Sequence, residues 1–197
     1  MTADKYEFII TISTDGFLKF WKKVQIGVEY VKTFKAHTGA ITAACVSSDQ
    51  DRLCTVSQSD RQLKIFDVAN FDLIQSIDLE FEPGCGISFV FSPISYKIAI
   101  SESKTGKIHL FKEGDSLPIK SNEKHDSPIK LIISGSKFSI SIDNQSMLEF
   151  WDSDFEFPKS LKFELMSDTD FFNLCDDKIL AISMSPDEQT LSTMSNT

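Results

Sequence analysis

The most reactive side chains of this chain belong to four cysteines and three histidines, and their spacing decides which chemistry is open to them. The cysteines are Cys45, Cys54, Cys85 and Cys175, and the histidines are His37, His109 and His125. No two cysteines form a C-x-x-C pair, and none lies at zinc-ligand spacing from a histidine. The sequence therefore predicts no metal site and no bound cofactor.

Cys45 and Cys54 flank the polar stretch Ser48-Asp49-Gln50-Asp51. If the chain reverses near Asp49-Gln50, residues whose numbers sum to 99 face each other, and the two cysteines meet across a hairpin. We expect two small buried thiols here, and a redox role is the alternative that the sequence leaves open. No basic neighbour in the sequence activates either thiol.

Catalysis needs an acid, a base and a nucleophile that converge, and the remaining polar residues show no such pattern. His37 and His125 fall in predicted loops, where we expect a structural role, and His109 occupies the polar slot of a predicted strand. Asp168, Asp170, Asp176 and Asp177 do not follow the order of a calcium loop. Gly84-Cys85-Gly86 lacks the lysine of a phosphate loop, so we predict a turn before a strand. We predict no catalytic residue.

These residues are set within a repeat of four segments, each with an aromatic residue followed by Asp or Lys at its end. The aromatic residues are Trp21, Phe66, Phe111 and Trp151, spaced by 45, 45 and 40 positions. Apolar and polar residues alternate before each one, which is typical of a strand. A period of about 40–45 residues with several short strands per unit is typical of β-propeller blades.

The repeat divides the chain into five expected units, at about 7-36, 37-82, 86-123, 125-166 and an incomplete 179-197. In the second unit we expect strands at 41–47, 52–57, 62–67 and 72–79. The first unit lacks an evident inner strand. We therefore predict an all-β chain, a partial β-propeller of about four to five blades of four-stranded antiparallel sheets. Unfinished blades expose apolar faces and strand edges, so we expect the isolated chain to self-associate.

Composition narrows the classes of partner. The 197 residues carry a net charge of −9, which disfavours a phosphate-binding surface, so a nucleic-acid partner is not expected. No apolar run approaches the roughly 20 residues that a membrane helix needs. We expect other proteins as partners, with no small-molecule substrate. Phe155 and Phe157 follow Trp151 and are a candidate partner surface, with packing on the outer strand as the alternative.

The repeat resembles the WD-repeat family. Trp151-Asp152 matches the family's Trp-Asp pair, and Ala36-His37 and Lys124-His125 stand where its Gly-His pair belongs. Asp15 and Asp60 occupy the family's turn position before the third strand, whereas Thr105 and Gln145 depart from it. In the family the aspartate bonds the histidine, which bonds a hydroxyl and the tryptophan. The resemblance thus implies structural roles for all these positions, with His37 and Asp60 as the best candidate pair.

Segments along nearly the whole chain resemble WD-repeat proteins that also carry a cyclophilin-type peptidyl-prolyl isomerase domain. They are residues 8–23, 64–72, 103–108, 157–159 and 167–170. The resemblance implies a nuclear, spliceosome-associated parent protein whose propeller precedes the isomerase domain. Nothing in this chain resembles the cyclophilin part, so no catalytic residue carries over, and the chain would be a docking portion. The alternatives are that the chain itself is a peptidyl-prolyl isomerase, or that it is an RNA-binding propeller.

Overall fold

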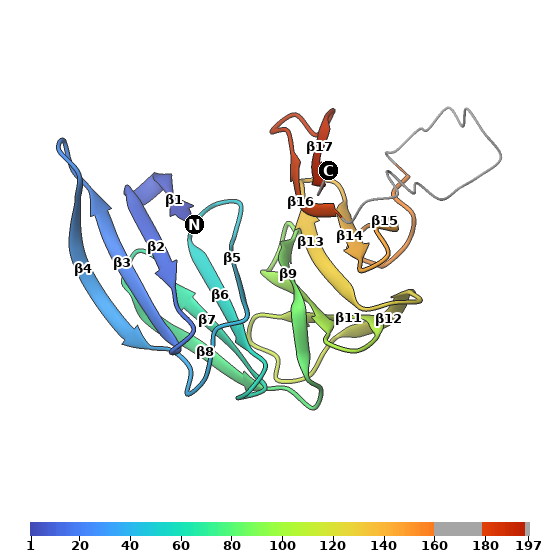
Figure 1. Ribbon diagram of the computed structural model, residues 1–197, viewed down its shortest axis with the longest axis horizontal. Helices are drawn as coiled ribbons and strands as arrows, with labels where there is room; N and C mark the ends of the chain where they lie inside the picture. Colours follow the sequence, from blue (N-terminus) through green and yellow to red (C-terminus); the bar gives the residue numbers. More distant parts are fainter. Residues whose placement is uncertain (160–178, 196–197) are drawn as a thin grey trace. The chain divides into compact units, whose positions relative to one another are not determined.

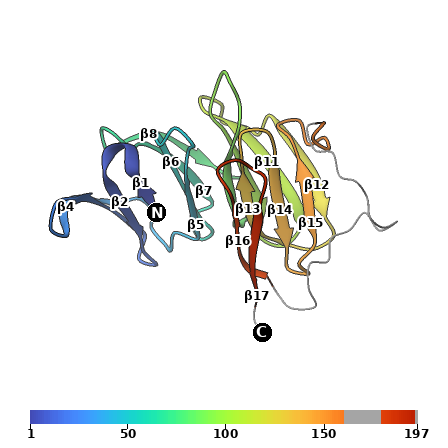
Figure 2. The same cartoon turned by 90° about the horizontal axis from the view of Figure 1, so that it is seen from above.

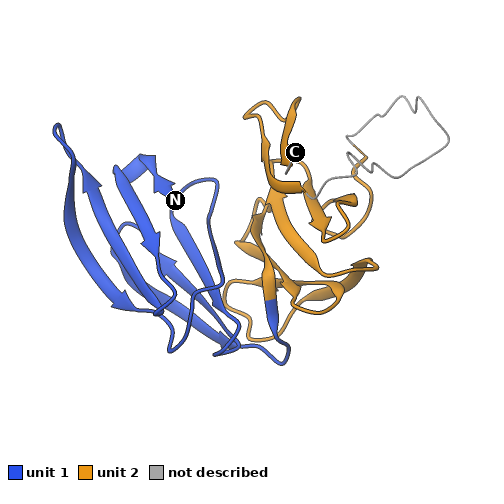
Figure 3. Cartoon of the chain, in the orientation of Figure 1, with its two compact units in different colours: residues 1–83 blue, residues 84–197 orange. Residues whose placement is uncertain are grey.

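The computed structural model of the protein describes residues 1–159 and 179–195, and in these ranges its regular structure is almost entirely antiparallel β-sheet (Figure 1). One short 3-10 helix, η1 (Asp4–Tyr6), is present among them. None of the helical segments described is long and apolar enough to span a bilayer. The chain forms two compact units, residues 1–83 and 84–197, each described below by itself (Figure 3).

The first sheet opens the first unit as a four-stranded meander in which each strand pairs with the next. Its strands are β1 (Thr2–Ala3), β2 (Phe8–Ile12), β3 (Phe17–Lys23) and β4 (Val28–Lys35). The prediction that this unit lacks an inner strand is wrong, because β1 pairs Thr2 with Ile9 and Ala3 with Phe8. A strand of two residues carries no alternating pattern that the sequence could reveal.

The second sheet completes the first unit with the same meander. Its strands are β5 (Ala43–Val46), β6 (Arg52–Ser57), β7 (Gln62–Asp67) and β8 (Asp72–Asp78). The bounds of β6 and β7 confirm the predicted strands, β5 is shorter than its prediction, and β8 ends one residue earlier. The register pairs Cys45 with Cys54, which confirms the predicted hairpin.

The third sheet lies in the second unit and again has four strands in sequence order. They are β9 (Pro83–Val90), β10 (Lys97–Glu102), β11 (Gly106–Lys112) and β12 (Lys120–His125). The turn predicted at Gly84-Cys85-Gly86 is wrong, since these residues lie within β9. A Cβ added at Gly84 would lie 2.6 Å from the Ser101 hydroxyl oxygen, so glycine there permits close strand packing.

The fourth sheet has three described strands, which lie side by side in Figure 2, and a two-stranded sheet follows it. The strands are β13 (Ile129–Ser134), β14 (Ser139–Asp143) and β15 (Leu148–Trp151), then β16 (Ile179–Met184) and β17 (Leu191–Ser195). The outer strand expected before residue 166 falls largely on residues 160–178, outside the described residues.

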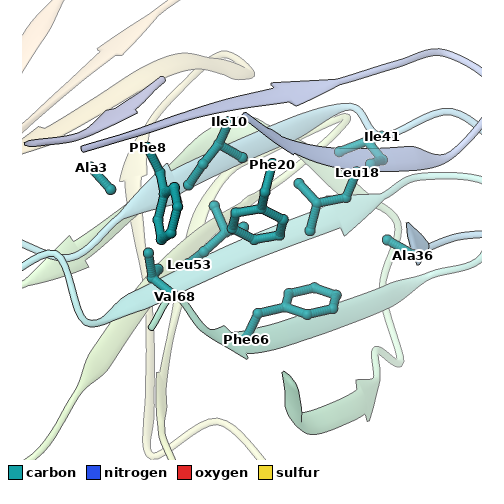
Figure 4. Packing of buried hydrophobic residues seen from close by; sticks show 10 residues of the cluster. All are labelled: Ala3, Phe8, Ile10, Leu18, Phe20, Ala36, Ile41, Leu53, Phe66 and Val68. Atoms are coloured by element: carbon teal, nitrogen blue, oxygen red, sulfur yellow. The ribbon is translucent and has the colours of Figure 1, made fainter. Parts of the chain in front are cut away.

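The core of the first unit lies between its two sheets (Figure 4). The apolar face of the first sheet contributes Phe8, Ile10, Leu18 and Phe20, all buried. Residues of the second sheet, which include Leu53, Phe66 and Val68, pack against them. Phe71, from the turn after β7, places its ring centroid 5.0 Å from that of Phe8 and 4.9 Å from that of Phe20. Burial of these rings is the main stabilisation of the pair of sheets.

The second unit has two comparable apolar layers. One joins the third and fourth sheets and contains Val90, Ala99, Ile108, Leu110, Ile129, Ile132, Trp151 and Phe155. The other joins the fourth sheet to β16 and contains Phe138, Ile140, Ile142, Leu148 and Ile179. The fourth sheet therefore buries both of its faces, as stacked repeats require.

Candidate functional site

The four repeat aromatics occupy the third strand of four successive sheets. Trp21 lies in β3, Phe66 in β7, Phe111 in β11 and Trp151 in β15. Three of them are almost completely buried, whereas Trp21 is only half-buried and packs edge-on against Tyr30 at a centroid distance of 5.8 Å. The aromatic position is therefore structurally equivalent in all four repeats but fully enclosed in the last three.

In the second sheet a carboxylate gathers the residues that precede the inner strand. Asp60 accepts hydrogen bonds from the Thr38 hydroxyl (2.6 Å), the Thr38 N–H (2.7 Å) and the Gly39 N–H (3.0 Å), and it lies 3.3 Å from His37 Nδ1. Burial raises the pKa of Asp60, but these hydrogen bonds and His37 outweigh burial and hold the pKa well below its ordinary value.

The histidine of this network is buried and bonded on its other side to the second strand. His37 Nε2 lies 2.9 Å from the Thr55 hydroxyl oxygen. Burial lowers the pKa of His37, as does the nearby Lys64, while Asp60 opposes them. The chain of bonds stops at Thr55, because the aromatic position holds Phe66, which has no N–H to donate.

The fourth sheet carries the fuller network. Trp151 Nε1 donates to the Ser141 hydroxyl oxygen at 3.0 Å, and His125 Nε2 lies 2.7 Å from the same oxygen. His125 Nδ1 lies 3.5 Å from Asp143. A neutral imidazole with Nδ1–H toward Asp143 lets Ser141 donate to Nε2 while it accepts from Trp151, so every group is satisfied.

Asp143 is a site residue that the sequence argument missed. The family pattern placed the aspartate at position 145, where this chain has Gln145. The structure takes the carboxylate from two positions earlier, and Asp143 also accepts hydrogen bonds from the N–H groups of Gln145 and Met147, both at 2.9 Å. An aspartate followed by Asn and Gln in a predicted turn is the signal that could have found it.

The first and third sheets depart from this network. In the first, Trp21 Nε1 donates to the Thr11 hydroxyl oxygen at 3.0 Å, and Asp15 contacts Ser13 in its own turn rather than a histidine. In the third, Ile100 pairs with His109 where Ser141 pairs with Glu149 in the fourth, so an aliphatic side chain replaces the hydroxyl, and Phe111 has no N–H to donate.

His109 is buried, and its two ring nitrogens contact neighbouring strands. Its Nδ1 lies 2.8 Å from the Ser121 hydroxyl oxygen and its Nε2 lies 2.8 Å from Glu102. Burial lowers the pKa of His109, and Glu102 partly opposes that effect. The cluster joins the three outer strands of the third sheet, β10, β11 and β12.

A pocket of about 380 Å³ opens beside the network of the fourth sheet. Its lining combines four carboxylates with four other side chains: Glu123, Asp126, Asp143, Glu149, Lys124, His125, Gln145 and Met147. Glu149 is half-buried, and no residue in the described ranges donates it a hydrogen bond. Burial raises the pKa of Glu149, and Lys124 partly opposes this. The pocket is thus acidic and suits a cationic group.

The two phenylalanines of the candidate partner surface differ in their solvent exposure. Phe155 is only 4% exposed and packs on Trp151 with ring centroids 5.2 Å apart, so the expectation of an exposed Phe155 is wrong. The reason is a left-handed backbone at Phe155 (φ 62°), which turns its ring back onto the sheet. Phe157 is 56% exposed and keeps its place as a candidate surface residue.

A left-handed phenylalanine after the third strand of a sheet occurs in both units. Phe71 also adopts a left-handed backbone (φ 60°) after the third strand of its sheet. A lysine of the preceding sheet's outer strand donates to the carbonyl in each case: Lys32 to Phe71 at 3.5 Å and Lys124 to Phe155 at 2.6 Å. These bonds join consecutive sheets at the residue whose ring packs on the core.

The remaining reactive residues form no catalytic arrangement that we can identify within residues 1–159 and 179–195. No group of three or more His, Cys, Asp or Glu side chains there could hold a metal ion. The aspartates at 168, 170, 176 and 177 lie outside the described residues. What the described geometry offers is a set of sheets tied by buried polar networks, with a pocket at one of them.

A family match agrees with this geometry. The "WD domain, G-beta repeat" family matches residues 28–67, which run from the outer strand of the first sheet, β4, through β7. The match therefore includes His37, Thr55 and Asp60, the residues of the network in the second sheet. Residues 28–67 form a WD repeat. The all-β sheets of the chain are those of a partial WD-repeat β-propeller.

Curated relatives of this WD-repeat chain extend the similarity over nearly its whole length. The human "Peptidylprolyl isomerase domain and WD repeat-containing protein 1" is 35% identical over 204 residues, which cover 98% of this chain and 31% of the relative. "Peptidyl-prolyl cis-trans isomerase CYP71" of Arabidopsis thaliana is 37% identical over 196 residues, with 94% and 31% covered. "Peptidyl-prolyl cis-trans isomerase cyp15" of Rhizopus delemar is 36% identical over 205 residues, with 99% and 32% covered. The WD-repeat chain thus spans about a third of the length of these relatives.

Proposed function

We propose that this chain is a protein-interaction scaffold, the WD-repeat portion of a cyclophilin-type peptidyl-prolyl isomerase that works in the nucleus with spliceosomal partners. The observation that carries the proposal is the set of closed polar networks, which fix loops on rigid sheets without presenting a reactive group. The names of the relatives support the link to an isomerase, and the chain's share of their length leaves room for a separate catalytic domain. Rigid scaffolds that position loops are well suited to binding.

The partner contact that the geometry favours is the acidic pocket of the fourth sheet. His125 and Asp143 hold the two loops that line it, so the pocket is preorganised. The Glu149 carboxylate, which accepts no hydrogen bond from the described residues, would gain a charge-assisted hydrogen bond from a cation. We therefore assign the pocket to a lysine or arginine side chain of a partner peptide.

A binding experiment tests this assignment. The chain is titrated against peptides that carry one central arginine or lysine and against matched peptides with glutamine at that position. We expect weaker binding of the glutamine peptides, and weaker binding of the basic peptides by Glu149→Gln. Asp15→Asn, which removes an exposed carboxylate that is not among the residues lining the pocket, is the matched control. Equal affinities of Glu149→Gln and wild type would reject the pocket as the contact.

The second candidate function is that the chain itself isomerises X–Pro bonds, and the names of the relatives favour it. Uncatalysed isomerisation takes tens to hundreds of seconds, so catalysis is easily measured. We expect the 197-residue chain to leave the cis–trans isomerisation rate of a proline-containing peptide unchanged, at concentrations where a cyclophilin accelerates that isomerisation. Acceleration that persists through purification would replace the scaffold proposal with an enzymatic one.

A further inference from the structure

We propose that Cys45 and Cys54 form a modification site, a thiol pair that closes to a disulfide under peroxide and reopens under thiol reductants. The observation is geometric. The two side chains face each other across neighbouring strands, with their Sγ atoms 3.1 Å apart, and both cysteines are free in the structure. The inference is independent of the scaffold function.

The register of the two strands brings the cysteine Cα atoms within the range that a disulfide spans. Cys45 in β5 and Cys54 in β6 are register partners. The Ser47 N–H donates to the Arg52 carbonyl at 2.9 Å, and hydrogen-bonded pairs alternate along an antiparallel ladder. Cys45 and Cys54, two residues further along each strand, are therefore also a hydrogen-bonded pair, with Cα atoms about 5.5 Å apart. Disulfides span Cα separations of roughly 4.4–6.8 Å, so the Cα spacing permits the bond, and the Cβ atoms of such a pair need to approach by about 1 Å.

The two thiols differ in access, which sets the order of the reaction. Cys54 is completely buried and Cys45 is partly exposed. Burial raises the pKa of Cys54 well above its ordinary value, and the neighbouring Cys45 adds to this. Cys45 is therefore the thiol that meets an oxidant from solvent, and Cys54 is the one that resolves the product.

The chemistry balances with hydrogen peroxide as the oxidant. The Cys45 sulfur attacks one peroxide oxygen, the O–O bond breaks, and Cys45 becomes a sulfenic acid as one water leaves. The Cys54 sulfur then attacks the Cys45 sulfur, the S–O bond breaks, and the hydroxyl leaves as a second water with the Cys54 proton. Two thiols are oxidised by two electrons in all, and a dithiol reductant returns them.

The disulfide would brace a hairpin that contacts the first sheet. The turn between β5 and β6 holds Gln50, whose side-chain oxygen accepts from the Lys5 N–H at 2.6 Å, and Asp51, which accepts from the Tyr6 hydroxyl. Linking Cys45 to Cys54 closes the loop that contains this turn. Because the link restricts the unfolded chain, oxidation should raise the melting temperature of the first unit, by about 5 °C.

Peptide mapping of the full chain tests the site. Folded protein is treated with peroxide, quenched, unfolded, alkylated and digested, because Cys54 cannot be reached by reagents in the folded state. We expect an internal Cys45–Cys54 link, a mass lower by about 2 Da for the two hydrogens lost, and full reversal by dithiothreitol. Cys45→Ser should abolish the link, and Cys85→Ser, a matched control with an exposed thiol in β9, should leave it unchanged.

The same treatment of urea-unfolded protein keeps the test independent of any variant's folding. A link that depends on the folded register forms faster and more selectively in the folded chain. Links that form no faster than in urea, links to Cys85 in place of Cys54, or oxidation of Cys45 that a dithiol does not reverse would each overturn the proposal.

Discussion

At the scale of single residues, the same amino acid at the same repeat position meets two different surroundings. Asp60 and Asp15 both precede a third strand, in the second and first sheets. The Asp60 side chain is nearly buried and accepts hydrogen bonds from Thr38, from the Gly39 N–H and from two serine hydroxyls besides its contact with His37. Asp15 is exposed and contacts Ser13 in its own turn. The difference between them is in what surrounds the carboxylate.

We expect Asp60→Ala to destabilise the chain by about 2–3 kcal/mol, because it leaves the N–H groups of Thr38 and Gly39 without their acceptor. Asp15→Ala should leave the unfolding midpoint close to that of wild type, since water replaces the exposed carboxylate. Urea unfolding followed by circular dichroism measures both. Equal midpoint shifts for the two variants would show that Asp60 does not hold the loop.

His125 predicts a dependence of stability on pH. Burial lowers its folded pKa below the ordinary value of 6.5, although Asp143 opposes burial and Asp126 lies nearby. Below pH 6.5 the unfolded chain therefore binds more protons than the folded chain does. The contribution of His125 to the free energy of unfolding is fully present above pH 6.5 and is lost as the pH falls toward the folded pKa. His37 and His109, whose pKa values burial also lowers, contribute in the same direction.

The contribution of His125 is separated by substitution. His125→Gln keeps a hydrogen-bonding side chain without a titrating group, so its urea midpoint should fall less between pH 7.5 and 5 than that of wild type, as the linkage predicts. The comparison is of slopes, which makes it independent of the variant's absolute stability. Parallel pH profiles for the two proteins would mean that His125 is accessible to protons in the folded state.

At the scale of elements, turns place the networks, and Gly16 shows how. This glycine lies in the turn between β2 and β3 with a φ of 81°, and its carbonyl accepts from the N–H groups of Ala36 and His37. A Cβ there would lie 2.2 Å from the His37 carbonyl oxygen and 2.5 Å from that of Gly39. Both obstacles are backbone, so neither can swing away, and the turn is closed to any other residue.

We expect Gly16→Ala to destabilise the first unit by about 3 kcal/mol or more, through left-handed strain and overlap together. Gly27 is the matched control: its φ is 92°, but nothing lies within 4 Å of a Cβ built on it. Gly27→Ala should cost only the conformational strain, about 1–2 kcal/mol. Thermal unfolding of both variants provides the measurement, and similar losses would show that the crowding at Gly16 relaxes at little cost.

The strands and turns also show which features of the fold can be predicted from the sequence. Alternation predicted the bounds of β7 correctly, because apolar and polar residues alternate along that strand, whereas β6, which is almost wholly buried, was bounded by the polar turns on either side. The inner strand β1 has only two residues, too short to carry a period. Phe155 was misplaced because a single left-handed residue reverses its ring, and a phenylalanine gives no sign of that backbone. Asp143 was missed because its carboxylate acts from a different turn position.

At the scale of the whole molecule, the described sheets become smaller toward the C-terminal end. Three sheets have four strands, the fourth has three described strands, and β16 and β17 form a two-stranded sheet. In the described part of the chain β17 pairs only with β16, so its other edge has open backbone groups. Leu180 and Met194 are exposed on these strands, at 39% and 57%. Apolar side chains beside an open strand edge favour pairing with another chain.

We therefore expect the isolated chain to self-associate through β16 and β17. Sedimentation velocity across a concentration series should show a monomer that converts to larger species, and Leu180→Glu together with Met194→Glu should return it to the monomer. Leu117→Glu is the matched control, because Leu117 is more exposed than either residue, at 65%, but lies between β11 and β12. The net charge of −9 opposes association, so added salt should strengthen it if the apolar contact is the driving force. A monomer at every concentration and salt level would show that these strands are adequately covered within one chain.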